Sequence, residues 1–426
     1  MFDWILEKML RKLFLGNDKN LKKKIYIWTI LSGLFYSASS TVMLMVTTNV
    51  LGTEGGDIFS LGLMIGQQLI TIGYFYIRNY QVSDVKQMYS FADYFTSRVI
   101  TCSIMMIAAL IWIVAGGYGK KASLVILYLC IYKMIEALSD VFEGLYHQRG
   151  RYDLASKGVV LKNIVTIAAY MIALIITKDI ILSTAVLAFS AVFMLFLFDS
   201  SVVGVFDKVR LNLNVKKQCS LHLACLPLFM NQFLITYINN SARYAIESLN
   251  QSSMLTVYNI IFMPAFVINL FSGFILKPLI TTMAKLNEEK DYKGFRKILS
   301  KQKIWILVLT VICVGGAYLL GTPVLSLLYH IDIRNYRAEL CVILVGGGFC
   351  ALYNAYCYAI VIIRKQYSML ISCVTTALLA AMLMPGLVKR FGMMGASAGY
   401  MALMMIMALI YMILFEFFLK RMEKKD

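Results

Sequence analysis

Residues 158–203 read GVVLKNIVTIAAYMIALIIT-KD-IILSTAVLAFSAVFMLFLFDSSVV, two apolar runs separated only by Lys178 and Asp179. A helix needs about 20 mainly apolar residues to cross the hydrocarbon core of a bilayer, and each run is long enough for one crossing. A connection this short holds two helices side by side and antiparallel. The segment therefore predicts a pair of membrane-spanning helices.

The composition of the whole chain also indicates a membrane protein. Of 426 residues, 60% are hydrophobic and 15% are charged, and the mean hydropathy is +0.73. Soluble domains contain about 45–50% apolar and about 25% charged residues, so the chain is too apolar for a soluble enzyme of two or three domains. Long apolar runs also exclude an outer-membrane barrel, whose strands are short and alternate between apolar and polar residues.

Segments that meet the length criterion for a crossing helix recur along the whole chain. We predict them at 25–50, 58–77, 98–117, 122–146, 158–177, 180–203, 221–243, 254–276, 304–328, 338–362, 367–388 and 393–419. The predicted fold class is an all-α polytopic membrane protein with about 12 transmembrane helices.

The distribution of basic residues predicts how these helices are oriented. With the N-terminus in the cytoplasm, 32 of the 41 Lys and Arg residues fall in cytoplasmic segments and 8 in outer segments, while Lys133 lies inside a span. Because basic residues concentrate on the cytoplasmic side of membrane proteins, both termini are predicted to be cytoplasmic. This rule accounts for the net charge of +18 without a nucleic-acid partner, which we do not expect.

The two longest internal connections, 204–220 and 277–303, organise the chain. The first separates six spans from six, which suggests two repeats related by a pseudo-twofold axis with a substrate site between them. The second carries eight basic residues and is predicted to be a cytoplasmic amphipathic segment on the membrane surface. The predicted parts are an amphipathic, basic cytoplasmic segment 1–24, an N-lobe 25–203, a linker 204–220, a C-lobe 221–419 and a basic cytoplasmic tail 420–426.

The fourth predicted span carries an unusual row of charges. Its sequence KMIEALSDVFEGLYH places five polar side chains three or four residues apart, on one face of a helix: Lys133, Glu136, Asp140, Glu143 and His147. A charged helix face is unfavourable in contact with lipid, so this face must line the bundle interior or a water-filled cavity. Glu136 and Asp140 are candidates for coupling to a cation or proton. The alternative is a Lys133–Glu136 ion pair, with the other acids in cytoplasmic water.

Basic residues mark the inner ends of several other spans. Together they are candidates to bind a phosphate or diphosphate, to which Arg offers a bidentate fork and Lys a point charge: Arg78, Arg98, Lys162, Lys277 and Arg364. The alternative is that each one follows the positive-inside rule or extends its charge to the membrane surface. Asp84 and Asp93 lie between Arg78 and Arg98 and are alternative salt-bridge partners for these two arginines.

The seventh predicted span, within MNQFLITYINNSARYAIES at 230–248, is polar for its position. The amides of Asn239 and Asn240 are candidates to bind sugar hydroxyls, or else to hydrogen-bond neighbouring helices. Arg243 lies at the outer end of this span, where positive charge is disfavoured, and this position favours a functional role.

Four stretches of the sequence resemble one family. They are similar to the polysaccharide and O-antigen flippases of the multidrug/oligosaccharidyl-lipid/polysaccharide (MOP) exporter superfamily: RNYQVSD at 78–84, EALSDVFEGLYHQRGRYDLAS at 136–156, YINNSARYAIES at 237–248 and FMPAFVINLFSGFILKPLI at 262–280. The similarity covers most of the chain, and the predicted span count and orientation agree with it.

The resemblance implies two six-helix lobes in a V around a central cavity. It implies that an undecaprenyl-diphosphate-linked oligosaccharide is moved from the inner to the outer leaflet of a bacterial plasma membrane by alternating access. Coupling to H⁺ or Na⁺ is implied, with no other cofactor, as are contacts with membrane lipids and with polysaccharide polymerase or export proteins. The implied roles are ion coupling for Glu136 and Asp140, and diphosphate or sugar-phosphate binding for Arg78, Arg98, Lys133 and Arg243.

Two other functions remain open at this point. A drug/cation antiporter of the same superfamily predicts an acidic and aromatic cavity, whereas the span ends of this chain are basic. A membrane-embedded glycan polymerase or acyltransferase predicts a large outer loop with catalytic residues, but the predicted outer loops are short and the three histidines are dispersed. We therefore expect a transporter rather than an enzyme, without catalytic or metal-ligating residues and without a nucleotide-binding motif.

Overall fold

The computed structural model of the chain describes residues 20–424, with the exception of 85–86, 250–251, 364 and 366. Within these ranges the side chains of seven residues are not described: Lys22, Ser83, Ser252, Ser253, Lys277, Pro278 and Thr281. The described chain is helical almost throughout and contains no strand. Most of the predicted amphipathic segment 1–24 and the last two residues of the tail 420–426 lie outside the described residues.

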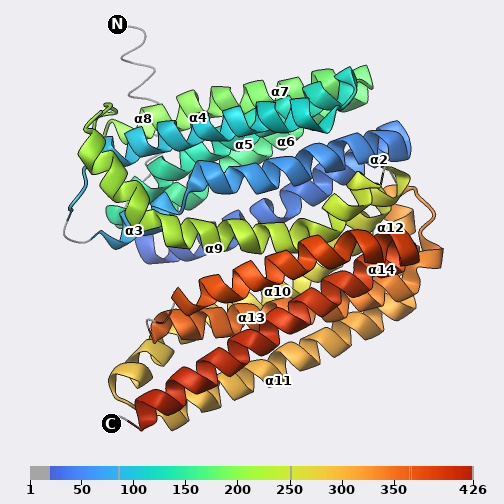
Figure 1. Cartoon of the computed structure of the whole chain (residues 1–426). Helices are drawn as coiled ribbons and strands as arrows, with labels where there is room; N and C mark the ends of the chain where they lie inside the picture. The colour runs from blue at the N-terminus through green and yellow to red at the C-terminus, as the bar shows by residue number, and fades with distance from the viewer. Residues whose placement is uncertain (1–19, 85–86, 250–251, 364, 366, 425–426) are drawn as a thin grey trace, which may run out of the picture. The chain divides into compact units, whose positions relative to one another are not determined.

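The chain divides into two compact units, Met1–Phe233 and Leu234–Asp426. The helices of the first unit follow one another with short connections (Figure 1): α2 (Leu21–Tyr74), α3 (Ile77–Ser83), α4 (Phe91–Gly116), α5 (Lys120–Gln148), α6 (Tyr152–Thr177), α7 (Ile180–Met194), the π-helical turn η1 (Leu195–Asp199), α8 (Ser200–Val203) and the first part of α9 (Val215–Ser248).

The second unit contains the rest of α9 and the remaining helices. These are α10 (Ser252–Glu288), α11 (Tyr292–Gly316), the π-helical turn η2 (Ala317–Gly321), α12 (Thr322–Tyr329), the 3₁₀ turn η3 (Arg334–Tyr336), α13 (Arg337–Ile362) and α14 (Tyr367–Glu423). The division between the units falls inside α9, beyond the segment 204–220.

The segment 277–303, predicted to be an amphipathic segment on the membrane surface, is divided between two long helices. Its first part continues α10 to Glu288, and its second part begins α11 at Tyr292. Lys290 has left-handed backbone torsions (φ 60°) and Asp291 caps α11 by accepting a hydrogen bond from the backbone N–H of Gly294. The basic residues of this segment therefore lie on the last part of α10 and the first part of α11, except Lys290, which lies in the tight turn between them.

Helix α2 contains two membrane-crossing segments rather than one. Gly52 interrupts its helical torsions with φ 69° and ψ −163°. On either side of Gly52, the Thr47 hydroxyl lies 2.6 Å from the Tyr170 hydroxyl, and the Phe59 ring lies 5.4 Å from the Tyr170 ring. Residues 12 apart in a straight helix are separated by about 18 Å, so contact of both with Tyr170 requires the chain to reverse at Gly52.

Helix α14 reverses in the same way at Gly392, which has φ 57° and ψ −133°. A Cβ atom built at Gly399 would approach the Met384 sulfur to 2.5 Å, although 15 residues separate them in sequence. The structure has ten helices long and apolar enough to cross a membrane among its described residues, and two of these reverse at a glycine. The predicted all-α polytopic fold is confirmed.

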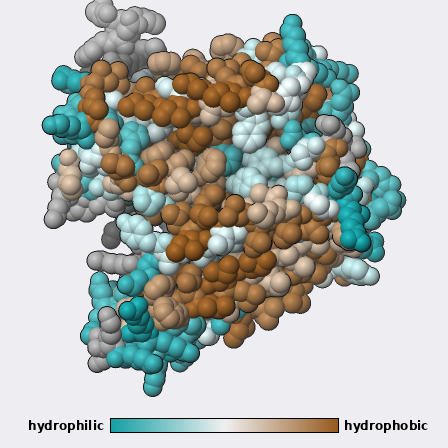
Figure 2. Space-filling model, in the orientation of Figure 1, coloured by the Kyte–Doolittle hydropathy of each residue, from teal (hydrophilic) through white to brown (hydrophobic). Residues whose placement is uncertain are grey.

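The outer surfaces of the helices are apolar, as lipid contact requires. Large hydrophobic side chains are more than half exposed on many helices, for example Val114 at 82%, Ile176 at 75% and Leu327 at 74%. Figure 2 shows these hydrophobic surfaces over the middle of the helices and hydrophilic residues at the helix ends. In water such exposure would be unfavourable, whereas hydrocarbon accepts it at no cost.

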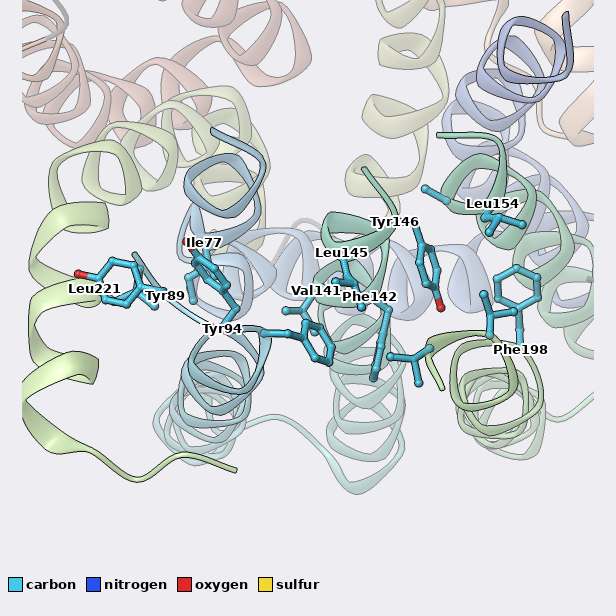
Figure 3. Packing of buried hydrophobic residues seen from close by; sticks show 14 of the residues in the cluster. Ile77, Tyr89, Tyr94, Val141, Phe142, Leu145, Tyr146, Leu154, Phe198 and Leu221 are labelled. Carbon is cyan, nitrogen blue, oxygen red and sulfur yellow. The ribbon is translucent and has the colours of Figure 1, made fainter. Parts of the chain in front are cut away.

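An aromatic cluster forms the core of the first unit (Figure 3). Val141, Phe142 and Leu145 of α5 lie between Tyr94 of α4 and Phe198 of η1, and all five are at least 94% buried. These residues occupy one face of α5. The row of charged residues occupies the other face, so the cluster fixes the orientation of the charged face towards α2, α3 and α4.

Three consecutive glycines let α13 pack against three neighbours in the second unit. A Cβ at Gly346 would lie 2.8 Å from the Tyr400 ring of α14, and one at Gly348 would clash with the Thr310 hydroxyl of α11. Gly347 faces Ala265 of α10 at 3.1 Å. Small residues allow this close approach, which drives helix association where no hydrophobic effect operates.

The reversal at Gly392 can be tested by adding one methyl group. Gly392→Ala should destabilise the protein by about 1–2 kcal/mol, because a Cβ disfavours left-handed backbone torsions. The matched control is Gly386→Ala in the same helix, where a Cβ also meets nothing within 4 Å but φ is helical, so alanine should be neutral or stabilising. Thermal unfolding in one detergent compares the two. Equal stability of the two variants would contradict the proposed reversal.

Candidate functional site

The charged face of α5 forms the centre of a polar network in the first unit. The Lys133 ammonium donates to the Glu136 carboxylate at 2.7 Å, and the Tyr74 hydroxyl of α2 donates to the other Glu136 oxygen at 2.9 Å. The side chains of Lys133 and Glu136 are 13% and 20% exposed. The ion pair expected as an alternative to a free cation site is therefore present.

Asp140, one turn further along α5, holds two arginines. The Arg78 guanidinium of α3 donates to one carboxylate oxygen at 2.7 Å, and the Arg98 guanidinium of α4 donates to the other at 2.7 Å. Arg98 is fully buried and also donates to the backbone carbonyl of Gly73 at 2.6 Å. A buried guanidinium is tolerated only with such partners, so Asp140 links three helices.

The network continues from Glu143 to the end of α7. Glu143 accepts from Arg78 at 2.9 Å and lies 3.6 Å from the Lys162 ammonium of α6. Lys162 also pairs at 3.1 Å with Asp199, whose side chain is 1% exposed and accepts a hydrogen bond from the Ser139 hydroxyl. Asp199 closes the network from the π-helical turn η1, and π-helical turns often occur at functional sites.

The network is electrically balanced. Its four cations are Arg78, Arg98, Lys133 and Lys162, and its four carboxylates belong to Glu136, Asp140, Glu143 and Asp199. Every carboxylate has at least one cationic partner within 3.1 Å. Removing one member leaves the buried charges unbalanced, and breaking a buried pair costs about 3–5 kcal/mol where the remaining partner has no other counter-charge.

A backbone break lies beside Asp140. Phe75 and Tyr76, between α2 and α3, both have left-handed torsions, with φ of 42° and 61°. Such torsions cost about 1–2 kcal/mol for a residue with a Cβ and persist where surrounding contacts fix them. Arg98 binds the carbonyl of Gly73 before the break, and Arg78 follows the break. Asp140 therefore connects both sides of the break through its two arginines.

Asp84 and Asp93 do not pair with Arg78 or Arg98, which contradicts that alternative expectation. The Asp84 carboxylate accepts from the backbone N–H groups of Met88 and Tyr89 and from the Tyr94 hydroxyl. Burial raises its pKa, but these three hydrogen bonds outweigh burial and lower the pKa below the usual 3.8. Asp93 forms a capping box with Ser90 at the start of α4. Both carboxylates accept hydrogen bonds from backbone N–H groups of the loop between them, and Asp93 also accepts one from the Asn212 side-chain amide at 2.7 Å.

A second group of polar residues lies in the second unit around Arg243 of α9. Its guanidinium donates to the side-chain oxygen of Asn259 on α10 at 2.6 Å and to that of Asn240 on α9. The guanidinium carbon lies 4.4 Å from the centre of the Phe262 ring. The residue is 6% exposed, and within the described part of the chain no carboxylate pairs with it. Arg243 is therefore a buried positive charge held by neutral groups.

Other polar groups surround this arginine. The Phe262 ring contacts the rings of Tyr258 and Tyr400, and the fully buried Tyr258 hydroxyl has no hydrogen-bond partner among the residues that the structure describes. The half-buried Asn239 lies beside Tyr353 of α13. This site combines a cation with amides and hydroxyls, a set that suits a phosphate and sugar hydroxyls.

The structure thus places the predicted site residues in two groups. Arg78, Arg98, Lys133, Glu136 and Asp140 belong to the network of the first unit. Asn239, Asn240 and Arg243 belong to the group in the second unit, whereas the side chain of Lys277 lies outside the described residues. Across the described ranges, no three His, Cys, Asp or Glu side chains are arranged to hold a metal ion.

Sequence reasoning missed several members of these groups. Asp199 is a carboxylate inside the predicted span 180–203, and this position was the signal that could have identified it. Asn259 is likewise an amide inside the eighth predicted span. The roles of Tyr258 and Phe262 had no sequence signal, because aromatic residues are common in every span.

Comparison with known proteins identifies the fold. No family model and no curated protein matches the sequence. Among solved structures, an inward-facing multidrug resistance MATE family transporter of the MOP superfamily matches with a TM-score of 0.68 and 11% identity, over 92% of this chain and 96% of that one. The bent form of the Vibrio cholerae MATE transporter VcmN matches with a TM-score of 0.59 and 12% identity, over 95% and 98%.

A third solved structure differs in its description. It is a MOP superfamily transporter from Pyrococcus furiosus, for which a binding pocket of reverse polarity suggests a different function; its TM-score is 0.59 at 13% identity, over 97% of this chain and 98% of that one. The chain therefore has the two-lobed fold of MATE transporters of the MOP superfamily. The resemblance seen in the sequence is supported for the fold, while the polysaccharide branch stays a prediction.

Neutralising Asp140 tests the balance of the network. Asp140→Asn should destabilise the protein by about 3–5 kcal/mol, because it leaves the buried Arg98 without a counter-charge. Glu54→Gln is the control, since Glu54 is 81% exposed and pairs with Lys121 at 3.3 Å. Loss of that surface pair should change stability by no more than about 1 kcal/mol. Equal unfolding temperatures for the two variants would show that Arg98 does not need Asp140.

The lowered pKa of Asp84 predicts a pH dependence of stability. Because the folded-state pKa lies below the unfolded value, the contribution is fully present above the unfolded pKa of about 3.9 and is lost as the pH falls through the folded pKa. The unfolding-temperature difference between the wild type and Asp84→Asn should be constant above about pH 5 and shrink below about pH 4. Glu288→Gln, at an exposed position, should show no difference at either pH. A difference for Asp84→Asn that grows on acidification would contradict this account.

Proposed function

We propose that this protein is an alternating-access transporter of a lipid-linked, diphosphate-bearing oligosaccharide. The observation that carries the proposal is the buried guanidinium of Arg243, which has neutral partners and no carboxylate among the described residues. A charged group inside a membrane protein is costly and marks a substrate or ion pathway. An unpaired cation in such a site favours an anion as its ligand.

The chemistry around Arg243 supports a phosphate rather than a simple halide. A guanidinium offers several N–H donors in a planar fork that matches two phosphate oxygens. The amides of Asn240 and Asn259 and the unpartnered hydroxyl of Tyr258 supply further donors and acceptors, which suit sugar hydroxyls. Asn239 is the proposed extension of this sugar-binding surface along α9.

The alternative of a drug/cation antiporter has the same fold but is less well supported by the charges. A site for organic cations needs carboxylates without cationic partners. In the network of the first unit, each of the four carboxylates is already paired with Arg or Lys. The different function suggested for the Pyrococcus furiosus transporter by the reverse polarity of its pocket supports the view that this fold can serve more than one function.

The network of the first unit has a different proposed role. Glu136 and Asp140 are the proposed sites of H⁺ or Na⁺ coupling, and Arg78, Arg98 and Lys133 are their partners or the second anion-binding group. Protonation of Asp140 would remove the carboxylate that Arg78 and Arg98 share, leaving Arg78 with Glu143 and Arg98 with the Gly73 carbonyl, and such a local charge change can bias a conformational equilibrium. The proposed location is the bacterial plasma membrane, beside the polymerase or export proteins that consume the glycan.

Replacement of Arg243 tests the proposed function. In proteoliposomes that contain an undecaprenyl-diphosphate-linked oligosaccharide, Arg243→Gln should lower the rate of lipid translocation about 10- to 100-fold, the value of one or two charge-assisted hydrogen bonds. Arg243→Lys should retain part of the rate, because the charge remains. Arg390→Gln is the matched control, since Arg390 is an exposed arginine that also lies over a phenylalanine ring.

Two results would contradict the proposal. One is translocation by Arg243→Gln at the wild-type rate. The other is uptake of a cationic dye by the wild-type protein with no movement of the diphosphate lipid, which would favour the antiporter.

A further inference from the structure

Helix α11 has two faces of different character. Its inner face packs into the second unit through residues that are at least 91% buried: Phe295, Leu299, Gln302, Ile306 and Thr310. Successive residues of a helix are rotated by about 100°, which identifies the residues on the opposite face. That face carries the exposed lysines Lys293, Lys297 and Lys301 in its first turns, followed by the exposed aliphatic residues Ile304, Val308 and Ile312. The outer face is therefore a single stripe that changes from basic to apolar.

The basic part of this stripe has no acidic partners. No ion pair within the described chain involves Lys293, Lys297 or Lys301. Two acids of α14 are occupied, because Arg296 binds Glu416 at 3.1 Å and Glu423 at 2.8 Å, and Asp291 accepts a hydrogen bond from the Gly294 N–H at 2.8 Å. This clamp also joins α11 to the end of α14, where Lys420 and Arg421 add two more exposed cations. Figures 1 and 2 show this hydrophilic end of the unit beside the C-terminus.

The apolar part of the stripe begins within one turn of the last lysine. Ile304 and Trp305 are 62% and 57% exposed, and Val308 and Ile312 continue the surface at 42% and 65%. Tryptophan concentrates at the level of lipid headgroups, and lysines near a helix end extend to the same level. The boundary between headgroups and hydrocarbon therefore crosses α11 between Lys301 and Ile304.

We propose that this stripe is a binding site for an anionic phospholipid, with the phosphate on Lys297 and Lys301 and an acyl chain along the apolar residues that follow. Lys293 and Lys301 are about 12 Å apart along the helix, so the three ammonium groups span one or two headgroups. Charge complementarity identifies the headgroup as anionic. The continuous apolar surface below it identifies the ligand as a lipid, because a nucleic acid or an acidic protein would leave that surface uncovered.

This site is separate from the proposed transport site. It lies on the outer face of α11, whereas Arg243 is buried among α9 and α10. The inference therefore does not depend on the transported substrate, and it concerns the lipid that surrounds the protein. Its consequence is that the second unit is more stable in a membrane that contains anionic lipid.

The test measures phosphatidylglycerol binding to the purified full-length protein. Native mass spectrometry and unfolding temperature are recorded in phosphatidylcholine nanodiscs or detergent as phosphatidylglycerol is added. For the wild type we expect bound phosphatidylglycerol and a rise in unfolding temperature, both weakened by salt. In Lys293→Gln/Lys297→Gln/Lys301→Gln the apparent affinity should fall about a hundredfold, since each lysine near an anionic surface contributes about fivefold.

Two controls separate this site from general effects of charge or folding. The triple variant Lys178→Gln/Lys389→Gln/Arg390→Gln removes the same charge from exposed positions elsewhere and should bind phosphatidylglycerol as the wild type does. The Lys→Arg triple variant at 293, 297 and 301 keeps the positive charges and should also retain binding. Retained binding would show that these positions tolerate substitution and that charge is what the Gln triple variant lacks. Three results would overturn the proposal: unchanged binding by the Gln triple variant of α11, an equal loss in the control triple variant, or equally strong competition by inorganic phosphate.

Discussion

The constraint on which the structure depends is that a charge inside a membrane protein needs a partner. Asp140 illustrates how such partners are provided. Its carboxylate binds Arg78 of α3 and the fully buried Arg98 of α4, at 2.7 Å each. Arg98 in turn binds the carbonyl of Gly73, where α2 ends before a strained break. The polar face of α5 therefore sets where three neighbouring helices lie, while the aromatic cluster on its other face fixes its rotation.

The two units meet this constraint differently. In the first, four cations and four carboxylates neutralise one another, so the network holds helices together and contains groups that can titrate. In the second, Arg243 is buried with amides and an aromatic ring, and its charge has no carboxylate partner among the described residues. This asymmetry supports an anionic cargo held in the second unit and ion coupling in the first, two roles that a coupled transporter needs.

Hydropathy alone predicted the fold class, because a crossing helix must be apolar over its whole length. It also located both reversals, since the predicted spans 25–50 and 58–77, and 367–388 and 393–419, flank Gly52 and Gly392. Apart from the Lys133–Glu136 pair, the pairing of charges could not be predicted. Arg78 and Arg98 have Asp84 and Asp93 as near neighbours in sequence, yet the helix packing brings Asp140 to both. Asp199 enters the network through a π-helical turn that no residue pattern indicates.

The central claim is that the lone charge of Arg243 exists to meet a phosphate of the cargo. A cryo-electron microscopy map of the full chain with bound undecaprenyl-diphosphate-linked oligosaccharide tests it most directly. The account predicts diphosphate density within about 3 Å of the Arg243 guanidinium, with at least one asparagine partner displaced. Density for the diphosphate elsewhere, with the guanidinium still held by Asn240, Asn259 and the Phe262 ring, would contradict it.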